Sequence, residues 1–174
     1  MLTRFFVTLV FLIGCFSVSA QDIFEAARTG NIEQIRALSK LNKDTVNAKN
    51  AGGFNPLMIA CYRGQTAAAK ELVNLGANIN QVSNEGTALL AAVYQNNTDL
   101  ALFLIKKKAT LNAQGPDGNS ALMYAVMNQN ASIVKALVKK KADKKLKNLD
   151  GQTAYSLALS LDDKGIQELV KIEI

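Results

Sequence analysis

Few residue types in this chain could carry out catalysis, and none of them stands in a catalytic arrangement. The 174 residues include no histidine, which removes the commonest general base and the commonest neutral metal ligand. The only cysteines are Cys15 and Cys61, and because Cys15 lies in an N-terminal apolar segment, we expect no disulfide between them. Cys61 has no histidine to activate it, so we expect a buried packing residue rather than a nucleophile. The sequence has no zinc-ligand, calcium-loop or phosphate-loop motif either, so we expect no enzyme, no metal site and no cofactor.

Two runs of three lysines are the strongest charge feature of a chain with a net charge of +6. They lie 33 residues apart, and each ends an apolar helical pattern, where the helix dipole favours cations. Two interpretations stay open: solubilising charges at helix ends, or a basic ridge that contacts an acidic partner or an anionic membrane. No aromatic residues alternate with the lysines to stack bases, so we expect no nucleic acid partner. The lysine ridge consists of Lys106, Lys107, Lys108, Lys139, Lys140 and Lys141.

Residues 1–20 have the composition of an export signal. Arg4 is the only charged residue, an apolar run follows it, and the small residues Val18 and Ala20 precede Gln21. This three-part pattern predicts a secretory signal peptide that is cleaved before Gln21. The apolar run is too short for a comfortable transmembrane span, so we expect an exported protein in the periplasm or the extracellular space.

A second interpretation of the N-terminus concerns Cys15. The string Leu12-Ile13-Gly14-Cys15 resembles the lipobox of bacterial lipoproteins, in which the cysteine becomes lipidated and forms the new N-terminus. In that case residues 1–14 are the signal, and the mature protein is lipid-anchored in the cell envelope. Both interpretations predict export.

A unit of about 33 residues recurs through the rest of the chain. Each copy has a buried-looking alanine in a short apolar string, and a second amphipathic segment follows it. The alanines are Ala26, Ala60, Ala92, Ala125 and Ala158, and a glycine precedes the last four at Gly53, Gly86, Gly118 and Gly151. The period divides the chain into repeats at about 21–49, 50–82, 83–114, 115–147 and 148–174, which together form one domain over residues 21–174.

These units resemble the ankyrin repeat, whose consensus begins D-x-x-G-x-T-P-L-H-x-A-A-x-x-G. The match is best in residues 50–80 and 117–142. The resemblance implies an all-α solenoid of about five helix–turn–helix repeats with short hairpin-like loops. In layout, the chain is similar to exported bacterial ankyrin-repeat proteins. It departs from the consensus at the histidine, which is replaced by Met58, Leu90, Met123 and Ser156, and it keeps the proline only at Pro56.

Local signals favour the same helices independently of the resemblance. A good N-cap residue precedes the first helix of each of the last four repeats, and its side-chain oxygen can accept a free backbone N–H. Pro56 suits the first helical position because its missing N–H has no partner there. Gly30 and Gly64 end helices where a left-handed residue is needed, and Asn96 can take the same role. The predicted N-caps are Asn55, Thr87, Ser120 and Thr153.

The resemblance also implies a binding surface, because in ankyrin proteins the hairpin tips and the exposed end of the first helix form a concave groove. Tyrosine, arginine and methionine are enriched at protein interfaces, although these side chains could simply cover the helix surface. Carried over by position, the partner-binding candidates are Phe54, Tyr62, Arg63, Tyr94, Gln95, Asn119, Met127, Asn128 and Gln152, continued by Arg28 and Thr29 at one end and by Ser160 and Leu161 at the other.

The sequence therefore predicts an exported, non-enzymatic protein-interaction module that is itself a monomer and binds another protein. The alternative is a membrane-anchored lipoprotein whose lysine ridge contacts anionic lipid or an acidic partner.

Overall fold

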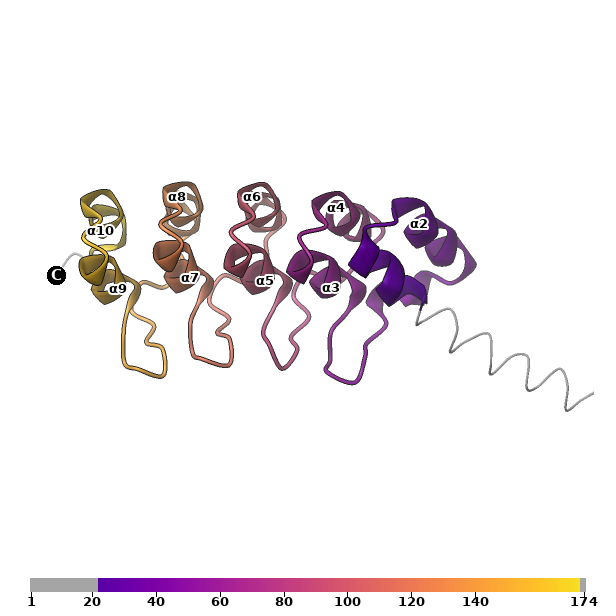
Figure 1. Cartoon of the computed structure of the whole chain (residues 1–174), viewed down its shortest axis with the longest axis horizontal. Coiled ribbons are helices and arrows are strands. Elements are labelled where there is room, and N and C mark those ends of the chain that lie inside the picture. Colours follow the sequence, from indigo (N-terminus) through magenta and orange to yellow (C-terminus); the bar gives the residue numbers. More distant parts are fainter. Residues whose placement is uncertain (1–21, 173–174) are drawn as a thin grey trace, which may run out of the picture.

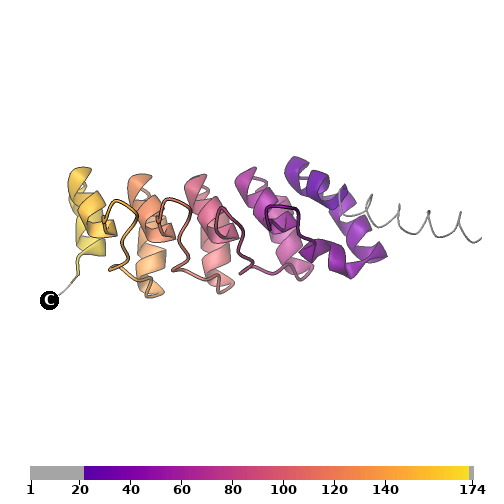
Figure 2. The ribbon, with the colours of Figure 1, turned by 90° about the horizontal axis from the view of Figure 1, so that it is seen from below.

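The computed structural model describes residues 22–172, which form a single row of paired helices (Figure 1). The first helix of each pair lies in one layer and the second helix in another, and hairpin-like loops extend from the layer of first helices (Figures 1 and 2). Within the described residues, the only β-structure is two isolated bridges, Ser83 with Gly86 and Gln114 with Ser120. The predicted all-α solenoid is therefore confirmed.

Five helical pairs make up the described part of the chain. The layer of first helices contains residues 22–29, α3 (Pro56–Tyr62), α5 (Ala88–Tyr94), α7 (Ala121–Met127) and α9 (Ala154–Ser160). The layer of second helices contains α2 (Ile32–Leu41), α4 (Thr66–Asn74), α6 (Thr98–Lys106), α8 (Ala131–Lys139) and α10 (Lys164–Val170), and a short 3-10 helix, η1 (Lys43–Asn47), follows α2.

The first helices begin and end where local chemistry predicts. Each predicted N-cap side chain accepts a hydrogen bond from the backbone N–H three residues later, as Asn55 does from Met58. Left-handed residues follow these helices, and the predictions for Gly30, Gly64 and Asn96 are confirmed. The equivalent positions of the last two repeats are taken by Gln129 and Asp162, with φ of 52° and 53°, which the sequence did not reveal.

The core runs along the whole row between the two layers. The five marker alanines are fully buried, so neighbouring first helices can approach closely. The second helices contribute one long apolar side chain per repeat at equivalent positions, and stacking joins these side chains into one continuous core. These residues are Leu38, Leu72, Leu104, Leu137 and Val170, all of them buried.

Side-chain amides at the starts of the second helices connect neighbouring repeats. The Asn97 amide nitrogen donates to the Thr66 hydroxyl at 2.7 Å, and the Asn130 amide donates to the Thr98 hydroxyl at 2.7 Å. A second row of asparagine oxygens accepts backbone N–H groups from the next repeat, as at Asn80, Asn112 and Asn47. The consensus histidine position is instead packed with apolar side chains at Met58, Leu90 and Met123. These contacts fix the stacking register of the repeats.

Candidate functional site

The reactive groups considered in the sequence do not form a chemical site in the described part of the chain. Cys61 is fully buried, and burial raises the pKa of its thiol, so the predicted packing role is confirmed. No group of three His, Cys, Asp or Glu side chains among residues 22–172 could hold a metal ion. None of the described helices is long and apolar enough to cross a membrane. Cys15 and the predicted cleavage site before Gln21 lie outside the described residues.

Two cavities lie next to each other on the surface formed by the first helices and the loops before them, which we call the inner face. They share Tyr62 and Glu85. The tyrosine cavity has a volume of about 320 Å³ and is lined by Tyr62, Glu85, Leu90, Tyr94, Pro116, Asp117 and Tyr124. The arginine cavity has a volume of about 390 Å³ and is lined by Arg28, Phe54, Ile59, Tyr62, Arg63, Glu85 and Gln95.

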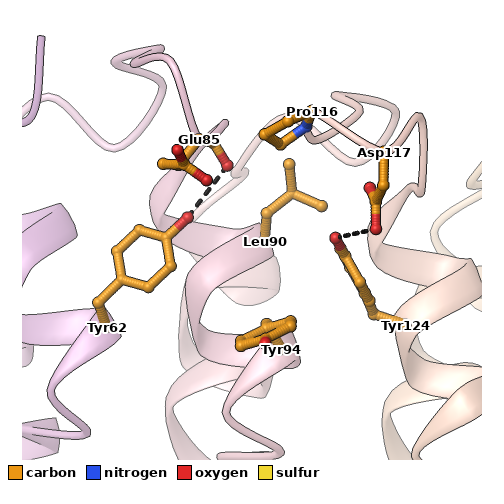
Figure 3. A pocket seen from close by; sticks show the side chains of 7 residues that line it. All are labelled: Tyr62, Glu85, Leu90, Tyr94, Pro116, Asp117 and Tyr124. Carbon is orange, nitrogen blue, oxygen red and sulfur yellow. Dashed lines mark hydrogen bonds between the residues drawn. The ribbon is translucent and has the colours of Figure 1, made fainter. Parts of the chain in front are cut away.

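Three tyrosines from three successive first helices form the walls of the tyrosine cavity. Tyr62 comes from α3, Tyr94 from α5 and Tyr124 from α7, and Figure 3 shows Tyr62 and Tyr124 on opposite sides with Tyr94 between them. The rings of Tyr94 and Tyr124 pack edge to face, with their centroids 5.4 Å apart and an interplanar angle of 84°. Such a pair is more favourable than parallel sandwich stacking because the positive ring edge meets the negative ring face.

Hydrogen bonds fix two of these tyrosines to the loop tips. The Tyr62 hydroxyl donates to the backbone carbonyl of Glu85 at 3.0 Å, and the Tyr124 hydroxyl donates to Oδ2 of Asp117 at 2.8 Å (Figure 3). Burial, with a further contribution from the charge of Glu85, raises the pKa of Tyr62 to about 12. Burial and the hydrogen bond to Asp117 raise the pKa of Tyr124 as well. Both hydroxyls therefore keep their protons at neutral pH.

Asp117 presents a fixed negative charge at the cavity rim. Besides the Tyr124 hydroxyl, its carboxylate accepts the Asn119 backbone N–H at 2.9 Å and the Asn119 side-chain amide at 2.6 Å. Partial burial acts to raise the pKa of Asp117, but these hydrogen bonds outweigh burial, and the pKa is lowered. The carboxylate is ionised at neutral pH and cannot rotate freely.

The arginine cavity combines aromatic and cationic side chains. The ring of Phe54 packs against the ring of Tyr62, with the centroids 5.8 Å apart. Arg28 is already paired with Glu25, the closest N–O distance being 2.6 Å. Arg63 is exposed and forms no ion pair with a described residue. The two cavities thus adjoin at Tyr62 and Glu85, and we call the pair the groove; its lining combines aromatic rings with charged side chains.

The structure brings together five of the nine predicted partner-binding residues. Three others lie apart from both cavities: Met127 is exposed, Asn128 donates its amide to the Val93 carbonyl at 2.8 Å, and the Gln152 side chain accepts from Asn148 at 3.1 Å. The five that line the groove are Phe54, Tyr62, Arg63, Tyr94 and Gln95.

The assignment of Asn119 to the contact surface needs correction. Asn119 is only 6% exposed, and its amide nitrogen is bonded to Asp117. Its amide oxygen accepts from the Asn148 side chain at 3.0 Å, which ties one loop to the next. Asn119 is therefore a structural residue that positions the cavity rim.

The repeat-by-repeat comparison missed Tyr124. This residue occupies the position that Ala91 takes one repeat earlier, so no equivalent residue drew attention to it. It precedes Met127 by three residues, and residues three apart share a helix face, which is a signal that could have identified it. The rim residues Glu85, Pro116 and Asp117 were also missed, although Glu85 and Asp117 directly precede the recurring glycines Gly86 and Gly118, which is a signal that could have identified them.

The lysine ridge lies away from the groove. Lys106 and Lys139 are the last residues of α6 and α8, and Lys108 and Lys141 follow them with φ of 64°. All six lysines are exposed. A third cavity of about 740 Å³ adjoins one end of the ridge, but its lining mixes lysines with Asp143 and Glu168.

Comparison with known proteins gives a consistent family match. The family model described as ankyrin repeats (3 copies) matches residues 23–115 and 108–174. A Rattus norvegicus protein, ankyrin repeat and SAM domain-containing protein 6, is 32% identical over 99 residues, which are 56% of this chain and 11% of that protein. Ankyrin repeat domain-containing protein 29 of Danio rerio is 38% identical over 61 residues, 35% of this chain and 20% of that protein.

Protein phosphatase 1 regulatory subunit 27 of Homo sapiens is 33% identical over 64 residues, 37% of this chain and 41% of that protein. The chain thus matches less than half the length of each of these relatives.

Proposed function

The chain belongs to the ankyrin-repeat family, and on that premise we propose that it is a non-enzymatic module that binds another protein through its inner face. Ankyrin repeats are generally protein-interaction modules, and one relative is by name a regulatory subunit of a phosphatase. The partner, its pathway and the way in which it is regulated are not carried over from any relative, because the family hosts many functions. We expect the protein to act as a monomer.

The observation that carries this proposal is the groove formed by the adjoining tyrosine and arginine cavities. Tyr94 is 59% exposed although it is a large aromatic side chain, and folding alone gives no reason for that exposure. Rigid aromatic side chains next to a cavity are typical interface anchors, because they offer much contact area at a small entropic cost.

The groove is also preorganised. Tyr62 and Tyr124 are held by their hydroxyl hydrogen bonds, and the same bonds hold the loops that carry Glu85 and Asp117. A partner would therefore bind without first ordering these side chains, which lowers the entropic cost of association.

The test compares two exposed side chains in the same repeat. We expect Tyr94→Ala to reduce capture of the partner from extracts of cells that make the protein by roughly tenfold, in the range of an interface anchor. Leu102→Ala, in α6 on the other layer, also removes an exposed side chain and should leave capture unchanged. Quantitative mass spectrometry of the captured proteins provides the measurement, and equal loss in both variants would reject the inner face as the binding surface.

For location, we propose export on the basis of residues 1–20, whose composition is that of a secretory signal peptide. Periplasmic or extracellular protein should begin at Gln21, whereas lipid-anchored protein should begin at an acylated Cys15. The mass of the mature N-terminus distinguishes the two, and an intact Met1 in the exported fraction would contradict both.

A second candidate function uses the lysine ridge, because six exposed lysines repeat at the ends of two stacked helices. In this alternative the ridge contacts anionic lipid or an acidic partner. A variant with Lys106, Lys107, Lys139 and Lys140 replaced by glutamine keeps Lys108 and Lys141, whose backbone is in the left-handed conformation. If this variant still captures the partner, the result supports the inner face as the protein-binding surface. If the variant no longer sediments with phosphatidylserine vesicles, the result favours the ridge as a lipid-contact surface.

A further inference from the structure

The tyrosine cavity carries a charge pattern that the protein leaves unbalanced. Among the seven residues that line it are two carboxylates, Glu85 and Asp117, and no lysine or arginine. Neither carboxylate forms an ion pair with any residue that the structure describes. Two arginines line the adjoining arginine cavity: Arg28, which is paired with Glu25, and Arg63, which forms no ion pair with Glu85 or any other described residue.

The hydrogen-bonding capacity of the cavity is also one-sided. The hydroxyl hydrogens of Tyr62 and Tyr124 are both donated to protein oxygens, so these two hydroxyls can only accept from a ligand. The Glu85 and Asp117 carboxylates are acceptors as well. Of the three tyrosines that line the cavity, only Tyr94 has a hydroxyl that makes no hydrogen bond to another described residue. The cavity therefore presents acceptors to a ligand almost exclusively.

The aromatic walls favour the same kind of ligand. The rings of Tyr94 and Tyr124 stand at 84° to each other and form a corner, with Tyr62 opposite (Figure 3). A cation within about 6 Å of a tyrosine ring face is attracted by the ring quadrupole. The volume of about 320 Å³ is enough for one long side chain and too small for a folded element.

We propose that the tyrosine cavity is a receptor for one cationic side chain, arginine or lysine, of the bound partner. Arginine and lysine side chains have donors and no acceptors, so they match a cavity that offers acceptors, two carboxylates and aromatic faces. An acidic or apolar side chain would instead leave the two carboxylates unpaired beside it, at the cost of their hydration. The choice of a partner protein as the source of this side chain rests on the function proposed above.

The test uses a defined probe, so it does not depend on the identity of the partner. The chain has four tyrosines and no tryptophan, and three of those tyrosines line the cavity. Binding can therefore be followed by NMR of the tyrosine rings during titration with N-acetyl-arginine amide or N-acetyl-lysine amide, with ionic strength held constant. N-acetyl-citrulline amide, which has the shape of the arginine probe without its charge, is the neutral comparison.

We expect saturable shifts of the Tyr62, Tyr94 and Tyr124 signals with the cationic probes, and binding of the citrulline probe that is roughly tenfold weaker. Glu85→Gln should weaken the cationic probes by about fivefold, since it removes one of two cavity charges. Asp150→Asn removes one charge from the loop before α9, at the position equivalent to Asp117, and should change nothing. The difference between the arginine and lysine probes identifies which cation the cavity prefers.

Citrulline binding as tight as arginine binding, or ring signals that no probe moves, would overturn the proposal. Failure here is distinguishable from failure of the proposed function. If the probes do not bind but Tyr94→Ala still abolishes partner capture, the groove binds its partner without a cationic anchor. If the probes bind but partner capture does not depend on Tyr94, the cavity binds cationic side chains, and the inner face is rejected as the proposed docking surface.

Discussion

Tyr62 connects the two cavities of the inner face. Its ring packs against Phe54, and its hydroxyl holds the loop that carries Glu85. Tyr94 lies at the equivalent position one repeat later but makes no such hydrogen bond and stays exposed. Two tyrosines at matching positions therefore differ in role: Tyr62 supports the groove as well as lining it, whereas Tyr94 is free to contact a ligand.

The partial burial of Tyr62 beside Glu85 raises its pKa and so predicts a dependence of stability on alkaline pH. The pKa of Tyr62 is raised to about 12 in the folded protein, against about 10 in an unfolded chain. Tyr62 keeps its proton to a higher pH in the folded state than in the unfolded state. Its contribution to the free energy of unfolding is therefore complete below about pH 10 and is lost as the pH rises towards 12. Urea unfolding across this range should show the loss in the native protein and a smaller loss in Tyr62→Phe, which cannot ionise. Equal slopes for the two proteins would contradict the assignment.

The hairpin-like loops are the elements that place the charged rim of the groove. Each loop stacks on the next, and the Leu149 backbone N–H donates to the Asp117 carbonyl at 3.1 Å. Gly118 lies at this contact with φ of +76°, and a Cβ added there would lie 2.7 Å from the Leu149 backbone nitrogen. The close approach of two backbones, rather than the turn alone, requires glycine at this position.

This packing predicts unequal effects for two equivalent glycines. Gly151 has φ of +74° but nothing within 4 Å of an added Cβ, so Gly151→Ala should cost only the left-handed conformation, about 1 kcal/mol. Gly118→Ala adds a backbone clash and should cost about 2–4 kcal/mol. Urea denaturation of both variants gives the difference. Similar losses would show that the loops do not pack as tightly as the structure indicates.

At the scale of the whole molecule, the period of the sequence predicted the stacking of repeats, because equivalent residues make the same packing contacts in each copy. The marker alanines, the N-caps and the left-handed glycines recur at fixed spacing, and each has a local physical reason. Asn119 shows the limit of this reasoning. A polar residue near a loop tip was expected to be exposed, but the stacking of adjacent loops buries it.

The cavities could not be derived from the period, because their linings break the repeat. Tyr62 and Tyr94 are equivalent residues, and Glu85 and Asp117 each precede a recurring turn glycine, but Tyr124 is not equivalent to either of the other tyrosines. Their meeting depends on the loop path and on the rotation between repeats. Those quantities follow from the assembled backbone rather than from the spacing of residues in one copy.

The central claim is that a partner protein occupies the groove of the inner face. Photo-crosslinking in the cells that make the protein tests it most directly, with a photoreactive residue placed at Gln95, which lines the arginine cavity, or at Leu102 on the other layer. The groove account predicts crosslinks to a distinct partner from position 95 and none to that partner from position 102. Crosslinks to the partner from position 102, with none from position 95, would contradict it.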